Sequence, residues 1–187
     1  MMSTMAADPV LQALMRSATQ ASGAELGVLL RHDGEVLRVV ATDGERAHVV
    51  SGATVPVHAG IAGYVLASGQ PIALSVKPGD PRLSDGVIAL LPVPPSTALC
   101  VPCTTDEDSV GALLLLDKAG GQFTFDDVEL ATLLAGIAGA ALAGGDAGRS
   151  RVPDPGELGG DLSRLAAADP ARYAMVATLV QALLARG

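Results

Sequence analysis

One segment, residues 110–142, constrains the fold more than any other part of the chain, because it joins a strongly apolar strand to a long amphipathic helix. Residues 110–116 read Val-Gly-Ala-Leu-Leu-Leu-Leu and are followed by a polar, glycine-containing turn at 117–121. A short apolar run bounded by turn residues is typical of a strand. Successive side chains of a strand point to opposite faces of a sheet, so the consecutive leucines need an apolar cover on both faces. The sequence predicts that this strand lies in the middle of a sheet.

The residues after this turn carry the signals of a helix N-terminus. Thr124 is a typical N-cap residue, Asp127 follows three positions later, and Asp126 adds a second carboxylate to the first turn. We expect a helix from Phe125 to about Ala143, whose apolar stripe covers one face of the sheet. The stripe consists of Val128, Ala131, Leu134 or Leu133, Ala138 and Leu142. Another part of the chain must cover the opposite face.

The N-terminal third predicts a helix followed by a β-hairpin. Asp8–Pro9 is an N-cap followed by proline at the first helical position, where its missing N–H costs nothing. Residues 25–32 and 35–42 are two β-rich runs separated by Asp33–Gly34, a strong hairpin signal. We interpret Val49–Val50 as an extension of an edge strand.

The middle of the chain supplies the second cover. Residues 60–69 predict a short helix that ends at glycine, and residues 71–76 predict a strand. Residues 77–95 are rich in Pro, Asp, Gly and Ser but also apolar, so we expect an irregular roof with one short helix over the uncovered sheet face. Residues 97–104 predict a strand antiparallel to 110–117. The fold class is therefore α+β, an antiparallel sheet with helices on one face and a roof over the other.

The C-terminal part is organised differently. Residues 8–143 are expected to form the domain, 144–157 a Gly/Asp/Pro/Arg-rich linker, and 158–187 a helical tail. Asp169–Pro170 repeats the helix start of the N-terminus. The last helix has an apolar stripe of Tyr173, Val176, Val180 or Leu179, and Leu183. The tail is too short for a domain of its own, so we expect it to pack near the N-terminal helix and the 125–143 helix.

Composition and charge exclude several classes of function. Nearly half of the 187 residues are apolar, but the longest apolar runs are shorter than the ~20 residues that a membrane span needs. The N-terminus lacks a secretory signal, so we expect a cytoplasmic protein. The net charge is −8 and the 12 Lys and Arg residues are scattered, which disfavours binding to nucleic acid or to an anionic membrane. Abundant Ala and Gly suggest a bacterial genome rich in G and C.

Three ordered blocks carry a family resemblance. Residues 60–71 read G-I-A-G-Y-V-L-A-S-G-Q-P, residues 98–102 read A-L-C-V-P, and residues 111–127 run from G-A-L through D-K to F-T-F-D-D. Over residues 8–143 the chain resembles the GAF domain, a small-molecule-sensing relative of the PAS domain. The resemblance implies a roofed pocket and a symmetric dimer formed by the first and last helices of the domain.

The expected pocket lies between the roof and the sheet. Its apolar lining is predicted to come from the short helix, the roof and the two neighbouring strands. The candidate residues are Ile61, Tyr64, Leu83, Val87, Leu91, Cys100, Leu113 and Leu115. The sequence does not identify the ligand or any cofactor.

The resemblance also assigns a structural ion pair. GAF domains that bind cyclic nucleotides carry an N-K…F-x-x-x-D-E signature, and this chain has Asp117, Lys118, Phe123, Asp127 and Val128 at those positions. Asp replaces the Asn and Val replaces the Glu. We interpret Lys118 and Asp127 as a pair that braces the strand end against the helix, which the family also uses where no nucleotide binds.

Cys100-Val-Pro-Cys103 matches the C-x-x-C pattern of redox and zinc sites. Here it lies in a predicted strand, where positions three apart point to opposite faces, so we expect two ordinary buried thiols. One GAF family reduces free methionine sulfoxide with cysteines in the roof and near the short helix. Residues 60–95 contain no cysteine, which disfavours that activity.

The histidines do not predict a metal site. His32, His48 and His58 are far apart in the sequence and lie in turn or edge positions. Haem would need an axial histidine, for which only His58 is suitably placed, and the two Tyr and two Phe residues make a poor haem or bilin cage.

We therefore interpret the chain as a non-enzymatic GAF sensory or regulatory protein. It is expected to bind a small molecule in the roofed pocket and to signal as a homodimer, with a protein partner recruited through the C-terminal helices. The alternative is a ligand-free interaction or dimerisation module whose pocket is filled by its own leucines. A redox enzyme of the free methionine sulfoxide reductase type is the third reading.

Overall fold

The computed structural model describes residues 8–148 except 78, 81, 82, 84, 106 and 107, together with residues 163, 164, 166–168, 170, 173 and 174. The chain divides into two units, Met1–Gly145 and Asp146–Gly187. In the second unit the described residues from 163 onwards are helical. Val176, Val180 and Leu183 of the predicted tail stripe lie outside the described residues.

The described part of the first unit contains a six-stranded sheet in which every strand runs antiparallel to its neighbours. The strand order is β3-β2-β1-β6-β5-β4, so β6 lies between β1 and β5, and the prediction of a central strand is confirmed. The strands are β1 Ala24–Asp33, β2 Val36–Gly44, β3 Thr54–Pro56, β4 Ile72–Ser75, β5 Thr97–Thr104 and β6 Ser109–Lys118.

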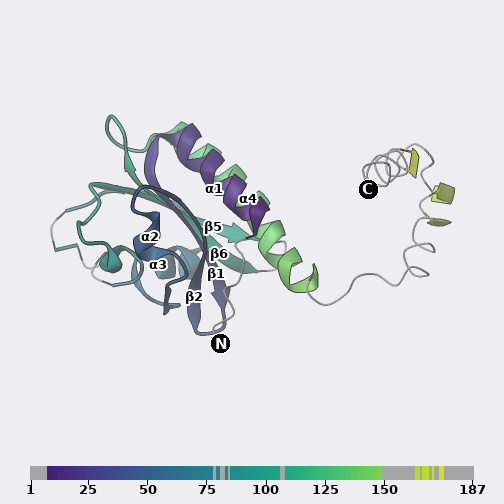
Figure 1. The fold of residues 1–187 in the computed structure, drawn as a ribbon, viewed down its shortest axis with the longest axis horizontal. Helices are drawn as coiled ribbons and strands as arrows, with labels where there is room; N and C mark the ends of the chain where they lie inside the picture. Colours follow the sequence, from purple (N-terminus) through teal and green to yellow (C-terminus); the bar gives the residue numbers. More distant parts are fainter. Residues whose placement is uncertain are drawn as a thin grey trace. The chain divides into compact units, whose positions relative to one another are not determined.

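Two long helices lie side by side on one face of this sheet (Figure 1). They are α1 Pro9–Ser22 and α4 Phe125–Gly148. Asp8 caps α1 by accepting the Val10 N–H at 2.8 Å, as its Asp-Pro start predicted. The helix α4 continues past Ala143, so residues 144–148 of the predicted linker are helical.

The opposite face is covered by short helices and irregular segments. The helices are α2 Ala47–Val50, α3 Gly60–Ser68 and the 3₁₀ turn η2 Ile88–Leu90. The prediction that Val49–Val50 extend an edge strand is wrong, because both belong to α2. Val50 is fully buried in the apolar layer beneath this cover, and that packing outweighs the strand preference of β-branched residues.

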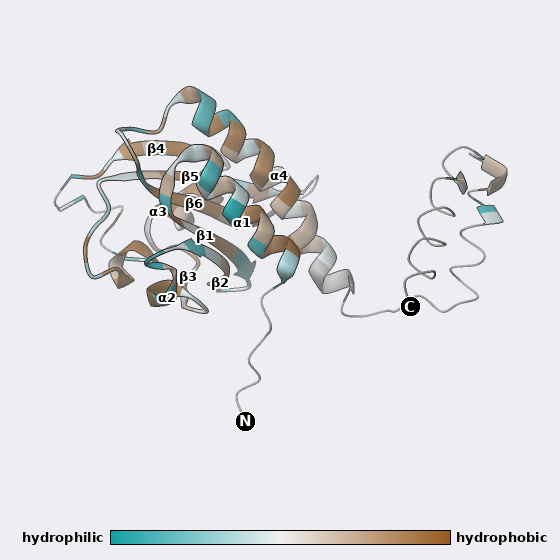
Figure 2. Ribbon diagram, turned by 45° about the horizontal axis from the view of Figure 1, so that its top comes forward, coloured by the Kyte–Doolittle hydropathy of each residue, from teal (hydrophilic) through white to brown (hydrophobic). Residues whose placement is uncertain are grey.

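The sheet separates two apolar cores, and in Figure 2 brown, apolar ribbon runs along the strands and recurs in the helices that cover them. Leu114 and Leu116 belong to the core beneath the roof, which we call the roof-side core. Leu113 and Leu115 belong to the core beneath α1 and α4, the helix-side core. All four are at most 1% exposed, as a strand covered on both faces requires.

Gly139 lets α4 pack directly on the end of β5. A Cβ atom at this position would lie 2.4 Å from the carbonyl oxygen of Thr104. Gly136, on the outer side of the helix, has no atom within 4 Å of such a Cβ. The small residue at position 139 therefore serves contact with the strand within this domain.

By length and composition, Phe125–Gly144 of α4 is apolar enough to cross a membrane. The core helix of a globular domain has the same composition. Ala131, Ala135 and Ala138 are buried in the helix-side core, which places one face of α4 on the sheet.

Candidate functional site

The roof segment encloses an open pocket of about 660 Å³ at the β4 and β5 edge of the sheet. This volume is within the range of about 300–1,000 Å³ that is typical of small-molecule sites. The apolar lining is Val76, Leu83, Ile88, Ala89, Leu91, Pro94 and Pro95, and the polar lining includes Lys77, Asp80 and Ser96. A ligand here would meet mostly apolar walls with a few polar residues at their margin.

Backbone hydrogen bonds fix the two ends of this segment. One bond joins the two ends of the roof to each other: the Val76 N–H donates to the Ser96 carbonyl at 2.8 Å. In the middle, the Asp85 carboxylate accepts the Gly60 N–H at 2.8 Å and so ties the roof to the first residue of α3. Gly60 has a φ of +63°, and a Cβ there would lie 2.7 Å from the Asp85 carbonyl oxygen. The glycine that begins the family-like block therefore allows the roof to approach α3.

The structure brings together only part of the predicted pocket. Leu83 and Leu91 line the pocket. Ile61, Val87 and Cys100 are buried in the roof-side core, where they pack against other apolar side chains.

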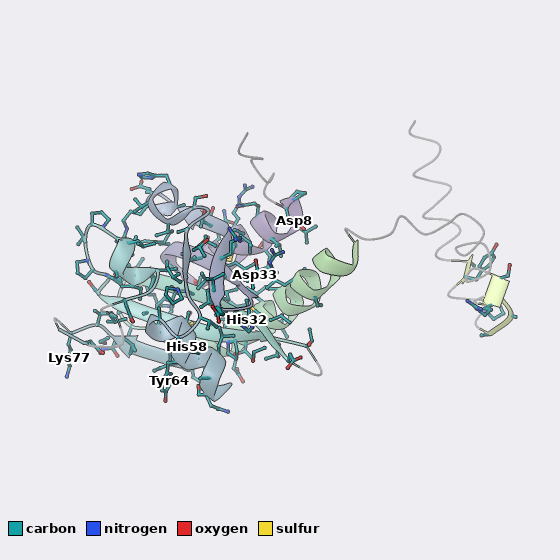
Figure 3. The ribbon with its side chains drawn as sticks, turned by 90° about the horizontal axis from the view of Figure 1, so that it is seen from below. Asp8, His32, Asp33, His58, Tyr64 and Lys77 are labelled. Carbon is teal, nitrogen blue, oxygen red and sulfur yellow. The ribbon has the colours of Figure 1, made fainter. Side chains whose placement is uncertain are left out.

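Three predicted pocket residues lie elsewhere. Leu113 and Leu115 face the helix-side core, so the prediction that they line a roof-side pocket is wrong. The strand pattern required leucines on both faces but did not say which pair faced the roof. Tyr64 is 54% exposed and points outward from α3, as Figure 3 shows, so it does not contribute to the pocket. Lys77 also extends outward at the roof in this view.

The predicted pair of Lys118 and Asp127 is present. The Lys118 Nζ lies 2.7 Å from each Asp127 carboxylate oxygen and 3.0 Å from the Ser22 carbonyl oxygen. The Thr124 N–H and hydroxyl donate to Asp127 Oδ2 at 2.6 and 2.9 Å. Burial raises the pKa of the Asp127 carboxyl, but hydrogen bonds from Lys118 and Thr124 and the Lys118 charge lower it by more. Asp127 therefore has a pKa below its ordinary value and stays ionised.

The neighbouring residue Asp117 makes contacts that the sequence did not predict. Its carboxylate accepts the Ser96 N–H at 2.5 Å and forms an ion pair with Arg46, the residue that precedes α2. Asp117 has a φ of +53°, a left-handed conformation that Asp tolerates better than most residues. In the sequence, the only indication of this role is an Asp before Lys118 at the end of a strand. The partners of Asp117, Ser96 and Arg46, are distant in the chain.

The sequence pattern of the GAF domain family matches residues 7–142, which include the sheet, α1, most of α4 and the pocket. The chain belongs to the GAF domain family. A comparison with curated proteins finds no significant match.

Solved structures show the same fold. The second GAF domain of DevS from Mycobacterium smegmatis is 22% identical, with a TM-score of 0.59 over 76% of this chain and 98% of that one. The GAF domain of a two-component sensor histidine kinase from Bacillus halodurans is 16% identical, with a TM-score of 0.62 over 76% and 97%. A type II free methionine-R-sulfoxide reductase from Thermoplasma acidophilum is 14% identical, with a TM-score of 0.61 over 73% and 92%. These structures are similar in fold, and they include a GAF domain of a sensor histidine kinase and an enzyme.

The two cysteines of this GAF domain point to opposite faces of β5, as predicted. Cys100 lies in the roof-side core and Cys103 in the helix-side core. Burial raises the pKa of both thiols, to about 12 for Cys103, and the charge of Cys103 raises the pKa of Cys100 further. Because the thiolate is the nucleophile, burial and the raised pKa values disfavour reaction of either sulfur at neutral pH.

Metal ligands are not gathered in the described part of the GAF domain. Among its described residues, no group of three or more His, Cys, Asp and Glu side chains is arranged to hold a metal ion.

Proposed function

We propose that this GAF domain is a regulatory module that binds a small molecule in the pocket at the sheet edge. The observation that carries the proposal is the pocket itself, with seven apolar lining residues and the polar residues Lys77, Asp80 and Ser96. A pocket that is mostly apolar with a few polar groups is the usual form of a small-molecule site. The sensor domains among the similar structures support the same reading.

We propose that the module is not an enzyme. A reductase would need an accessible thiolate, whereas Cys100 and Cys103 are both 0% exposed and have raised pKa values. This supports binding over catalysis in the described pocket.

We further propose that the domain acts as a homodimer through the outer faces of α1 and α4. Leu133 and Ile137 are 68% and 53% exposed and lie four positions apart on one side of α4, with the exposed Gly136 and Ala140 next to them. Val10 on the neighbouring α1 is 60% exposed. Small and branched apolar residues on adjacent helices suit close packing with the same helices of a second copy.

A ligand-free interaction module is the second candidate, and one observation favours it. The space between the centre of the sheet and its cover is filled by the domain's own side chains, among them Leu114, Leu116 and Val50, which are at most 1% exposed. In this alternative the open pocket at the sheet edge has no ligand, and the dimer is the functional unit.

Native mass spectrometry of the full chain, isolated from its own host, tests the proposal. We expect an additional small mass on the wild-type protein. Ala89→Trp should remove it, because Ala89 lines the pocket and an indole would occupy the space. Val93→Trp is the matched control, since Val93 lies in the same roof segment, is 63% exposed and does not line the pocket. A wild-type protein that carries no small molecule, with a dimeric mass, would favour the ligand-free module.

A further inference from the structure

We propose that the adjacent residues Asp117 and Lys118 couple the pocket in the roof to the pair of helices α1 and α4. The signalling role of this link rests on the proposed function, but its existence is a property of the protein without ligand. The two side chains leave one peptide unit at the end of β6 and bind elements on different sides of the sheet.

Asp117 holds the roof side. Its carboxylate accepts the N–H of Ser96, a pocket-lining residue whose carbonyl in turn accepts the N–H of Val76. The same carboxylate pairs with Arg46, which leads into α2 above the roof-side core. A ligand that displaces the wall at Val76 and Ser96 therefore pulls on Asp117 directly.

Lys118 holds the helix side. Its Nζ bridges the last carbonyl of α1, at Ser22, and the Asp127 carboxylate in the first turn of α4. The backbone continues the connection, since the Lys118 N–H donates to Thr97 Oγ1 at 3.0 Å and the Ala119 N–H donates to the Gly23 carbonyl at 2.8 Å. The relative position of the two helices is thus tied to the residue that follows Asp117.

The left-handed backbone at Asp117 explains how the two residues reach these partners. Strict alternation along β6 would place Asp117 with Leu113 and Leu115 on the helix side, and Lys118 with Leu114 on the roof side. The φ of +53° interrupts this alternation at the last step of the strand. As a result, a shift of one side chain rotates the peptide unit that carries the other.

The ion pairs of Asp117 and Lys118 are largely shielded from solvent. The side chains of Asp127 and Asp117 are 8% and 15% exposed, and those of Lys118 and Arg46 are 21% and 25% exposed. Charge pairs in this environment are screened less by water and salt than pairs on the open surface.

Hydrogen exchange of the full-length chain tests the coupling in the absence of any ligand. Lys118→Met removes the helix-side contacts, and we expect faster exchange at Asp127 and, across the sheet, at Val76 and Ser96. The increase at Val76 and Ser96 should be about fivefold or more, the lower end of coupling between sites. Arg46 also pairs with Glu25 at 3.9 Å, two residues from Gly23, so the reciprocal variant Arg46→Met is measured at Asp127, where exchange should rise by a similar factor.

Two further variants make the test specific. Asp117→Gly keeps the left-handed backbone, which glycine adopts readily, and removes only the connecting carboxylate. In the Asp117→Gly background, Lys118→Met should no longer change exchange at Val76 and Ser96. Arg38→Met, which breaks the ion pair with Asp33 at the β1–β2 hairpin, is the control and should leave both sides unchanged.

The proposal would be overturned if Lys118→Met changed hydrogen exchange only on the helix side of the sheet and Arg46→Met changed it only on the roof side. A response of Val76 to Lys118→Met that persists in the Asp117→Gly background would also overturn it. Failure of the small-molecule proposal would instead appear in native mass spectrometry as an unloaded protein, and exchange coupling could still be present.

Discussion

The Lys118 ammonium lies 2.7 Å from both carboxylate oxygens of Asp127 and so joins the end of the central strand to the start of the long helix α4. This contact links the leucine-rich strand to the helix that begins after Thr124, the two elements that the sequence predicts most clearly. It also completes the hydrogen bonds of the cap, since Asp127 accepts the Thr124 N–H while its own N–H approaches the Thr124 hydroxyl at 3.4 Å.

The first prediction concerns this pair and pH. Asp127→Asn keeps an oxygen for Thr124 but loses the charge, and we expect a loss of about 1.5–3 kcal/mol in the free energy of unfolding at pH 7. The native pKa of Asp127 is below its ordinary value of 3.8, so the stabilisation is complete above that pH. It should disappear as the pH falls through the lower native pKa. Urea unfolding at pH 7 and at progressively lower pH should show the free energies of unfolding of the wild type and the variant converging. A difference in stability that is independent of pH would contradict this account.

The second prediction uses two glycines of α4 as a matched pair. Gly139→Ala should destabilise the domain by about 1–3 kcal/mol, because the new Cβ would meet the Thr104 carbonyl oxygen at 2.4 Å. Gly136→Ala should stabilise the domain by about 0.5–1 kcal/mol when both glycine variants are compared in the Ile137→Lys background, where no second copy packs on the position and alanine is the better helix former. Thermal unfolding of the two variants should shift in opposite directions. Equal shifts would mean that α4 does not pack on β5 as described.

The third prediction concerns the thiols. Cys100 and Cys103 should react with a thiol probe at pH 8 only at the rate at which the protein opens, because burial raises both pKa values. In denaturant both should react at once. They should not form a disulfide with each other, since they face different cores. Rapid labelling of the folded protein would restore the redox interpretation.

The fourth prediction concerns the dimer. Ile137→Lys places a charge at the centre of the outer face of α4 and should convert a dimer of 18.7 kDa chains into monomers without loss of fold. Val93→Lys, at an apolar position in the roof that is 63% exposed against 53% for Ile137, should leave the mass unchanged. Multi-angle light scattering over a range of concentrations measures both. A wild-type protein that is monomeric at every concentration would contradict the proposed interface.

Local signals in the sequence were sufficient for most of the fold. Helices α1 and α4 begin at the predicted residues, Pro9 and Phe125, and the Asp33–Gly34 signal lies at the turn between β1 and β2. The run of leucines required a strand covered on both faces, and the two cores confirm it. These features depend on a few adjacent residues, so a single sequence contains them.

The candidate site depended on relationships that local patterns do not contain. Which leucines face the roof is decided by the register of β6 between β1 and β5, so Leu113 and Leu115 were assigned to the wrong face. The pocket formed at the sheet edge because the roof-side core is filled at its centre. The contact of Asp117 with Arg46 joins positions 71 residues apart, for which the sequence offered only an unusual Asp at the strand end.

A crystal structure of the full-length protein isolated from its native host tests the central claim most directly. We predict electron density for an organic molecule in the roof pocket, in contact with Leu83 and Leu91. A pocket that contains only solvent, or one closed by the movement of the roof onto β4 and β5, would contradict the small-molecule account.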